Sequence, residues 1–161
     1  MKLAQHCLSA IPLAVAGYAA AGGSFAAAFM AGVSSVLIDC DHVLDYLLCN
    51  KKWDGLSHFF ASCEEGRLPR LYLILHSFEL VCLLWLLVGT GTAAAWGVGL
   101  TIGVTGHMLM DWVGNRHLVQ PSFYWLWFRA MHRFDGNELY LTPPVPLAAE
   151  GEAMPPAAGR G

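Results

Sequence analysis

The chain has 161 residues, of which 56% are hydrophobic and only 13% are charged, and its net charge is −3. Soluble domains carry about 25% charged residues, so the composition argues against an ordinary soluble domain. The slight negative net charge gives no indication of a nucleic-acid partner, and none is expected. The five cysteines form no CxxC pair, which excludes the spacing of a zinc finger.

Four apolar stretches are each close to the roughly 20 residues that cross a bilayer. They cover residues 3–21, 24–47, 71–88 and 92–113. Asp, Glu, Lys and Arg are absent from 3–38, and Glu79 is the only one within 71–110. Small residues in the first, second and fourth stretches favour close helix packing. We therefore expect an all-α fold, an integral membrane bundle of four transmembrane helices over residues 1–140. The Pro-, Ala- and Gly-rich residues 141–161 are expected to be disordered.

The positions of Lys and Arg predict the topology of this bundle. In the four-span arrangement all nine fall at the same end, and the turns at 22–23 and 89–91 carry none. Positive charge is retained on the cytoplasmic side. We therefore predict a multi-pass protein of the inner (plasma) membrane with both termini in the cytoplasm.

Two further segments, 49–69 and 117–134, mix aromatic and charged residues. The second contains the run Phe123-Tyr124-Trp125-Leu126-Trp127-Phe128. Trp and Tyr favour the headgroup layer, so we expect both segments to form interfacial amphipathic helices.

Ionisable residues inside the spans are costly and usually functional. At about 1.5 Å per residue, each of the four helices places a histidine within one or two turns of the inner surface. The chain direction alternates between spans, so this agreement in depth is not automatic. The residues concerned are His6; Asp39, Asp41, His42 and Asp45; His76 and Glu79; and His107 and Asp111.

The local spacing of these residues fits a metal site. His107 and Asp111 are four residues apart on one helix face, and His42 lies three residues from both Asp39 and Asp45. Imidazole with carboxylate suits zinc, manganese or iron. A buried hydrogen-bonded His–Asp pair, or acids marking a helix end, would explain each group separately. The convergence from four helices favours one shared site.

The motifs Asp39-Cys40-Asp41-His42, His76-Ser77 and Gly106-His107-Met108-Leu109-Met110-Asp111 resemble those of a known family. With His6 in the first helix, they are similar to the membrane-bound metal-dependent hydrolases, also labelled LexA-binding, inner-membrane-associated hydrolases. That family looks like a helical membrane relative of zinc-dependent phospholipase C. The resemblance covers about residues 3–115 and implies a metal-dependent hydrolase. Leu37-Ile38 replaces the family's Leu-Pro, and Leu71-Tyr72 stands in place of its His-Arg.

We therefore predict a membrane-embedded hydrolase that uses one or two divalent ions, zinc or manganese. The substrate would be amphiphilic, with a lipid phosphoester as the favoured class. The expected metal ligands are His6, Asp41, His42, His76, His107 and Asp111. We assign Asp39 and Asp45 to catalysis, with Asp39 as a bridging ligand or the general base and Asp45 as an orienting residue. Arg116 is expected to bind phosphate.

Two other classes of protein compete with this prediction. A metal-binding transport or regulatory membrane protein without hydrolytic activity would also place His and Asp in its spans. A transporter would continue its polar groups through the membrane, whereas the outer halves of these spans are apolar. A bis-His haem protein is disfavoured by four nearby carboxylates. The sequence leaves the oligomeric state open.

Overall fold

The computed structural model describes residues 3–142, and the named elements within this range are all helices. This confirms the all-α prediction. Beyond residue 142 the expected disordered tail lies outside the described residues. The elements are α1 (Leu3–Ala20), α2 (Phe25–Leu37), α3 (Cys40–Asn50), α4 (Leu56–Glu64), α5 (Phe78–Gly89), α6 (Ala95–Gly114), the 3-10 helix η1 (Pro121–Tyr124), α7 (Leu126–Met131) and α8 (Gly136–Leu139).

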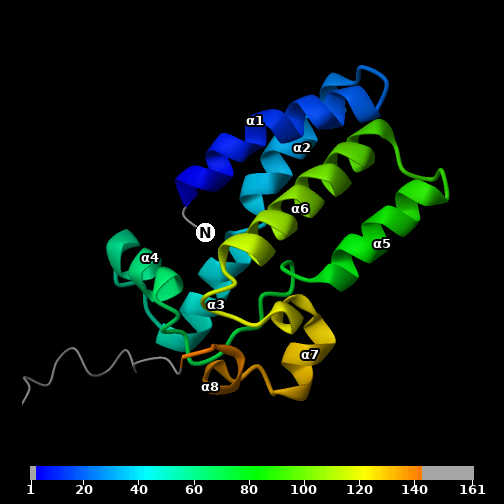
Figure 1. Ribbon diagram of the computed structural model, residues 1–161. Coiled ribbons are helices and arrows are strands. Elements are labelled where there is room, and N and C mark those ends of the chain that lie inside the picture. Colours follow the sequence, from blue (N-terminus) through cyan, green and yellow to red (C-terminus); the bar gives the residue numbers. More distant parts are fainter. Residues whose placement is uncertain (1–2, 143–161) are drawn as a thin grey trace, which may run out of the picture.

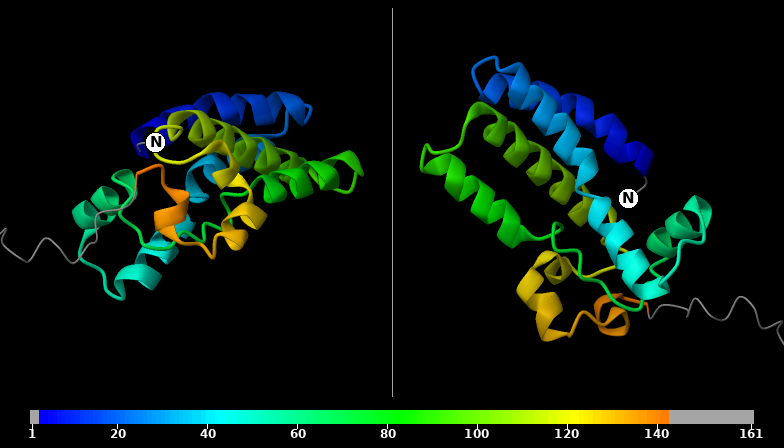
Figure 2. Two further views of the ribbon diagram at one scale, coloured as in Figure 1. Left: turned by 60° about the horizontal axis from the view of Figure 1, so that its bottom comes forward. Right: turned by 180° about the vertical axis from the view of Figure 1, so that it is seen from behind.

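The long helices α1, α2, α5 and α6 lie side by side, with α6 in contact with the other three (Figure 1). The α1–α2 and α5–α6 connections lie together at one end of this group. The smaller helices α3, α4, α7 and α8 gather at the other end, as the two further views in Figure 2 also show. Gly22 and Gly23 have φ of 63° and 89° and form the first of these turns, as their sequence predicts.

Small residues bring α6 against α2 in a regular register. A Cβ on Gly99 would collide with the backbone of Ala27, and one on Gly103 would collide with the backbone of Ala31 and the hydroxyl of Ser34. The two helices run in the same direction, so each step of four residues along one matches a step of four along the other. This close approach carries the residues that follow on α6 toward the end of α2.

Two helix boundaries differ from the sequence-based prediction. The helix expected over 24–47 is interrupted at Ile38–Asp39, where α2 ends and α3 begins. The helix expected from residue 71 begins only at Phe78. Ser77 has an extended backbone, and its hydroxyl accepts a hydrogen bond from Leu80 N at 3.3 Å, which caps this helix start. His76 therefore precedes α5 and does not lie within it.

Among the described helices, the stretch Phe25–Asn50 is long and apolar enough to cross a membrane. His6–Ala20 and Phe78–Gly89 are apolar but shorter. The prediction of four transmembrane helices is therefore not confirmed by the structure and remains a prediction.

Candidate metal centre

The register between α2 and α6 places His107 at the centre of a buried polar cluster. One turn beyond Gly103, the Nδ1 atom of His107 lies 2.7 Å from the carbonyl oxygen of Ser35. A carbonyl only accepts, so Nδ1 carries a proton, and Nε2 is the ring atom that faces the cluster. A backbone carbonyl on one ring nitrogen is a common way to fix a metal-binding histidine.

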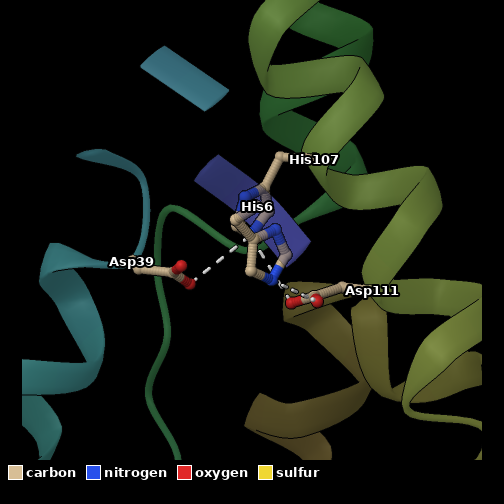
Figure 3. A group of neighbouring side chains, drawn as sticks. All are labelled: His6, Asp39, His107 and Asp111. Carbon is tan, nitrogen blue, oxygen red and sulfur yellow. Dashed lines mark ion pairs between the residues drawn. The ribbon is translucent and has the colours of Figure 1, made fainter. Parts of the chain in front are cut away.

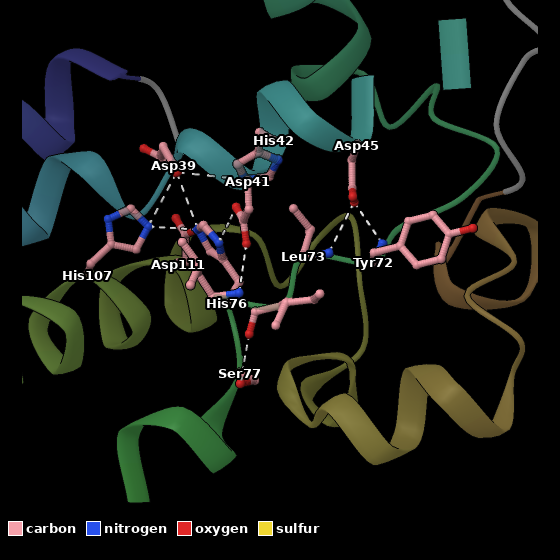
Figure 4. A network of polar contacts seen from close by, with 12 residues as sticks. Asp39, Asp41, His42, Asp45, Tyr72, Leu73, His76, Ser77, His107 and Asp111 are labelled. Carbon is pink, nitrogen blue, oxygen red and sulfur yellow. Dashed lines mark hydrogen bonds and ion pairs between the residues drawn. The ribbon is translucent and has the colours of Figure 1, made fainter. Parts of the chain in front are cut away.

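Three side chains surround His107 Nε2 at short range (Figure 4). His76 Nε2 lies 3.0 Å away, Asp39 Oδ1 3.4 Å and Asp111 Oδ2 3.5 Å. His76 Nε2 also lies 3.3 Å from Asp39 Oδ1 and 3.7 Å from Asp111 Oδ2. These atoms come from α6, the α2–α3 interruption and the segment before α5, so one point gathers groups far apart in the sequence.

These distances are those expected around a metal ion. Ligands about 2.0–2.1 Å from a tetrahedral zinc ion lie about 3.3 Å from one another. The five measured separations among these four atoms run from 3.0 to 3.7 Å. Two imidazoles and two carboxylates also match the ligand preference of zinc. The cluster can therefore hold a divalent metal ion.

Two more histidines flank this set and provide room for a second ion. His6 Nε2 lies 3.2 Å from Asp111 Oδ1, and its ring stacks on His107 with centroids 4.1 Å apart (Figure 3). His42 Nε2 lies 3.7 Å from Asp39 Oδ1. Two overlapping groups result, each with one ligand atom per residue within 4.8 Å of the others. They are His6, Asp39, His107 and Asp111, and Asp39, His42, His76 and Asp111.

Asp39 and Asp111 belong to both groups, which is the arrangement of two carboxylates shared between adjacent ions. The Nδ1 atoms of His6 and His42 are buried and have no hydrogen-bond partner among the described residues. Burying an imidazole with one unpaired nitrogen costs free energy unless the ring makes another favourable interaction. Metal coordination through Nε2 would be such an interaction.

Three charged side chains hold the non-helical segment 71–77 that carries His76. Asp41 Oδ1 lies 2.9 Å from His76 Nδ1, and its Oδ2 accepts a hydrogen bond from Leu75 N at 3.0 Å. Asp45 Oδ2 accepts from the backbone amides of Tyr72 and Leu73 at 2.7 and 3.1 Å (Figure 4). Asp41 and Asp45 therefore lie behind His76 and outside both ligand groups.

Arg129 of α7 completes this support and was not singled out by the sequence. Its side chain is fully buried and donates to the carbonyls of His76 and Leu73 at 2.9 and 2.8 Å. Its guanidinium also lies 5.1 Å from the centre of the Phe123 ring. Burial lowers the pKa of Arg129 to about 10, so it remains charged at neutral pH.

Leu73 needs support from both sides because its backbone has φ of +41°. A branched residue rarely adopts this left-handed conformation, which costs about 1–3 kcal/mol. Asp45 binds its amide and Arg129 its carbonyl. The segment before α5 is thus held in a conformation that places His76 at the cluster.

The electrostatic surroundings of His76 favour its protonated form when no metal is bound. Burial alone would lower its pKa, but hydrogen bonds to Asp39 and Asp41 raise the pKa to about 10. A metal ion bound at His76 Nε2 must therefore displace a proton.

The remaining predicted residues lie elsewhere. Arg116 is exposed just beyond α6 and is not among the residues that line the cavity described below. Glu79 accepts from the amides of Leu126 and Trp127 at 2.9 and 3.1 Å and so fixes the start of α7. His58 contacts the hydroxyl of Tyr46, and His132 contacts the carbonyl of Phe128.

A cavity of about 720 Å³ opens onto the cluster. Its polar end contains His6, Asp39, His42 and Asp111, with Asn115 and His117 nearby. The other walls are mainly apolar and come from α3, the loop before α4, α4 itself and the segments 68–73 and 118–124. They include Val43, Trp53, Leu56, Phe59, Phe60, Cys63, Leu68, Leu71, Leu73, Leu118, Val119, Phe123 and Tyr124.

Comparison with known proteins gives no relative for this chain: no family model, no curated protein and no solved structure matches it. The resemblance of its motifs to the membrane-bound hydrolases therefore remains a prediction.

Proposed function

We propose that this chain is a membrane-embedded, metal-dependent hydrolase of an amphiphilic phosphoester. The observation that carries the proposal is the gathering of four histidines and two aspartates from α1, α3, α6 and two inter-helix segments. Four of them, His6, Asp39, His42 and Asp111, line a cavity whose other walls are mainly apolar. Such a pairing of a polar, charged end with apolar walls suits a substrate that has a polar headgroup and a hydrocarbon part.

A single ion would be held by His76, His107, Asp39 and Asp111. With two ions, His6 and His107 would bind one and His42 and His76 the other, and Asp39 and Asp111 would be shared. When bound, a divalent ion at this position polarises a phosphoryl oxygen and lowers the pKa of water. Among the carboxylates of the cluster, Asp39 is the most accessible, because 24% of its side chain is exposed and it lines the cavity. It is therefore placed to take a proton from attacking water. Arg129, Asp41 and Asp45 keep His76 in position.

The membrane placement is supported by the surfaces of the long helices. α5 contains no buried residue and exposes Leu83, Trp85, Leu86 and Leu87. α1 exposes Leu8, Ile11 and Val15, and α2 exposes Phe25 and Phe29. Contiguous apolar surface of this kind is unusual in a soluble monomer and suits lipid contact.

The two turns at the far end of the long helices carry no charged residue. Every Lys and Arg within the described residues belongs to the opposite end, where the cluster lies. We therefore propose that this end faces the cytoplasm of the inner membrane, with both termini on that side. Reporter fusions at Gly91 and after the last residue should report opposite compartments, and the same compartment for both would refute the topology.

The reaction is tested with protein purified in detergent and supplied separately with zinc and manganese. We expect chelator-sensitive release of phosphate or a phosphorylated headgroup from lipid phosphoesters. His107→Gln should lose both metal and activity, whereas His132→Gln should keep both because His132 lies away from the cluster. Asp39→Asn should lower turnover more than metal content if Asp39 accepts the proton. Metal-loaded protein that releases nothing from a broad panel of lipid phosphoesters would favour a metal-binding transport or regulatory role.

A further inference from the structure

The cavity beside the cluster is larger than a headgroup requires and differs in character along its length. The His/Asp cluster occupies one end, while aromatic and aliphatic side chains of α3, α4 and segment 118–124 form the rest. A site that only received a headgroup from the surrounding lipid would need no apolar cavity of this size.

We propose that this cavity encloses the alkyl chain of a single-chain amphiphile, whose phosphoryl headgroup lies at the His/Asp cluster. This inference rests on the proposed function and specifies its substrate as a monoacyl lipid. In the structure, the chain would lie between Val43 of α3, Phe59 and Cys63 of α4, and Val119.

The volume of the cavity matches one chain. Pockets that enclose a single small ligand measure about 300–1,000 Å³, and this cavity measures about 720 Å³. A cavity in the middle of this range accommodates one alkyl chain with a small headgroup.

Helix α4 forms the wall through which a chain would enter. It projects from the side of the molecule and packs on α3 (Figure 2). Glycines with positive φ flank it, Gly55 at 97° and Gly66 at 64°. The hydroxyl of Tyr46 anchors the preceding loop through Asn50 Nδ2 at 3.1 Å and contacts His58 Nδ1 at 2.7 Å. The helix is thus fastened at its start while its inner face covers the cavity.

The charges of the cavity separate the roles of headgroup and chain. Among the described residues, its lining includes Asp39, Glu64 and Asp111 but no Lys or Arg. An anionic headgroup is therefore repelled unless a metal ion is bound, whereas the chain is held by apolar contact alone. Metal should strengthen the binding of lysophosphatidic acid and leave the binding of an uncharged monoacylglycerol unchanged.

The test measures binding, so it is independent of turnover. Monoacylglycerols and lysophosphatidic acids of increasing chain length, brominated near the chain end, are titrated into the protein in nanodiscs. Bromine in the cavity should quench Trp53, and Trp53→Phe identifies its share of the signal. We expect affinity to rise roughly fourfold per methylene and then to stop rising once the cavity is filled. Partition into the bilayer alone would show no such break.

Cys63→Trp, with Cys63→Ser as the control of matched size, tests the location. Cys63 is half-buried on the inner face of α4. The Trp side chain should move the break to shorter chains, and Ser should leave it in place. Val43→Trp, with Val43→Ala as its control, applies the same test from the opposite wall. Leu83→Trp on exposed α5 controls for added surface aromatics.

Three results would overturn the inference. The first is an affinity that rises with chain length without a break. The second is a break that both Trp substitutions leave unmoved. The third is a gain in affinity when residues 143–161 are removed, which would show that the chain's own C-terminal segment fills the cavity. Absence of hydrolysis alongside an intact, shifting break would instead refute only the proposed reaction.

Discussion

Asp41 offers a sharp test of the metal centre because it touches a ligand without belonging to either ligand group. Its carboxylate contacts His76 Nδ1 and accepts from Leu75 N. Asp41→Asn keeps the size of the side chain but can satisfy only one of these two partners as an acceptor. Loss of a carboxylate behind a metal-binding histidine weakens metal binding about 10–100-fold. We expect a loss of that size in zinc affinity.

The loss can be measured as stabilisation by zinc. At zinc concentrations 100 times the wild-type Kd, binding contributes about 2.7 kcal/mol to the free energy of unfolding. A 10–100-fold weaker site would contribute about 0.4–1.4 kcal/mol under the same conditions. The zinc-induced rise in Tm should therefore be smaller by roughly 3–9 °C. Thermal unfolding in detergent, with and without chelator, separates this effect from any change in the metal-free protein.

Asp54→Asn is the matched control, since Asp54 pairs with Lys52 on the exposed loop before α4. It should leave the zinc-induced shift at its wild-type value. If Asp41→Asn binds zinc as tightly as the wild type, His76 is not a ligand held by Asp41. If zinc leaves the Tm of the wild type unchanged, the metal centre itself is refuted.

Three further predictions follow from the same contacts. The pKa of His76 is raised to about 10, so zinc must displace its proton at any lower pH, and zinc affinity should increase about tenfold for each unit by which the pH is raised toward 10. Proton release on addition of zinc in weak buffer would measure this linkage. A zinc affinity that does not depend on pH would contradict the assignment of His76 as a ligand. Gly103→Ala should destabilise the protein by about 1–3 kcal/mol because its Cβ would collide with Ala31 and Ser34. Gly89→Ala is the control and should not destabilise, since the space around Gly89 is open. Equal unfolding midpoints for the two variants would argue against the α2–α6 contact. Arg129→Lys should lower the free energy of unfolding by about 2–4 kcal/mol in denaturant titration, and it should lower the metal content. The reason is that one ammonium cannot reach both carbonyls in the geometry of a guanidinium. Unchanged metal content would show that segment 71–77 keeps its place without Arg129.

The convergence of histidines from distant segments could be predicted from the sequence because depth along alternating apolar helices is simple to count. The contacts between particular helices were harder to predict than the depth of the histidines. The spacing of Gly99, Gly103 and His107 repeats that of Ala27, Ala31 and Ser35, and this repeat was a usable signal for the α2–α6 register. Ser77 was a usable signal for the start of α5, but the apolar residues before it favoured a longer helix.

The support of segment 71–77 had no comparable signal. Arg129 binds backbone carbonyls, which every residue possesses, so no pattern of side chains identifies its partners. Asp45 was predicted to be catalytic because it lies three residues from His42, and Asp41 was predicted to be a ligand as part of the motif Asp39-Cys40-Asp41-His42. The structure turns both toward a segment more than two dozen residues away in the sequence, which local spacing does not reveal.

The shortness of α5 has a consequence for the lipid around it. Its 12 residues span about 18 Å, whereas the 20 residues of α6 span about 30 Å, the thickness of a hydrocarbon core. In the proposed placement, this hydrophobic mismatch confines membrane thinning to one flank of the protein, where α5 meets α7. Headgroups and water would descend along that flank to the level of segment 71–77. Turnover should then be faster in bilayers of short-chain lipids than in thick, sterol-rich ones, so the thickness of the host membrane would regulate access to the site.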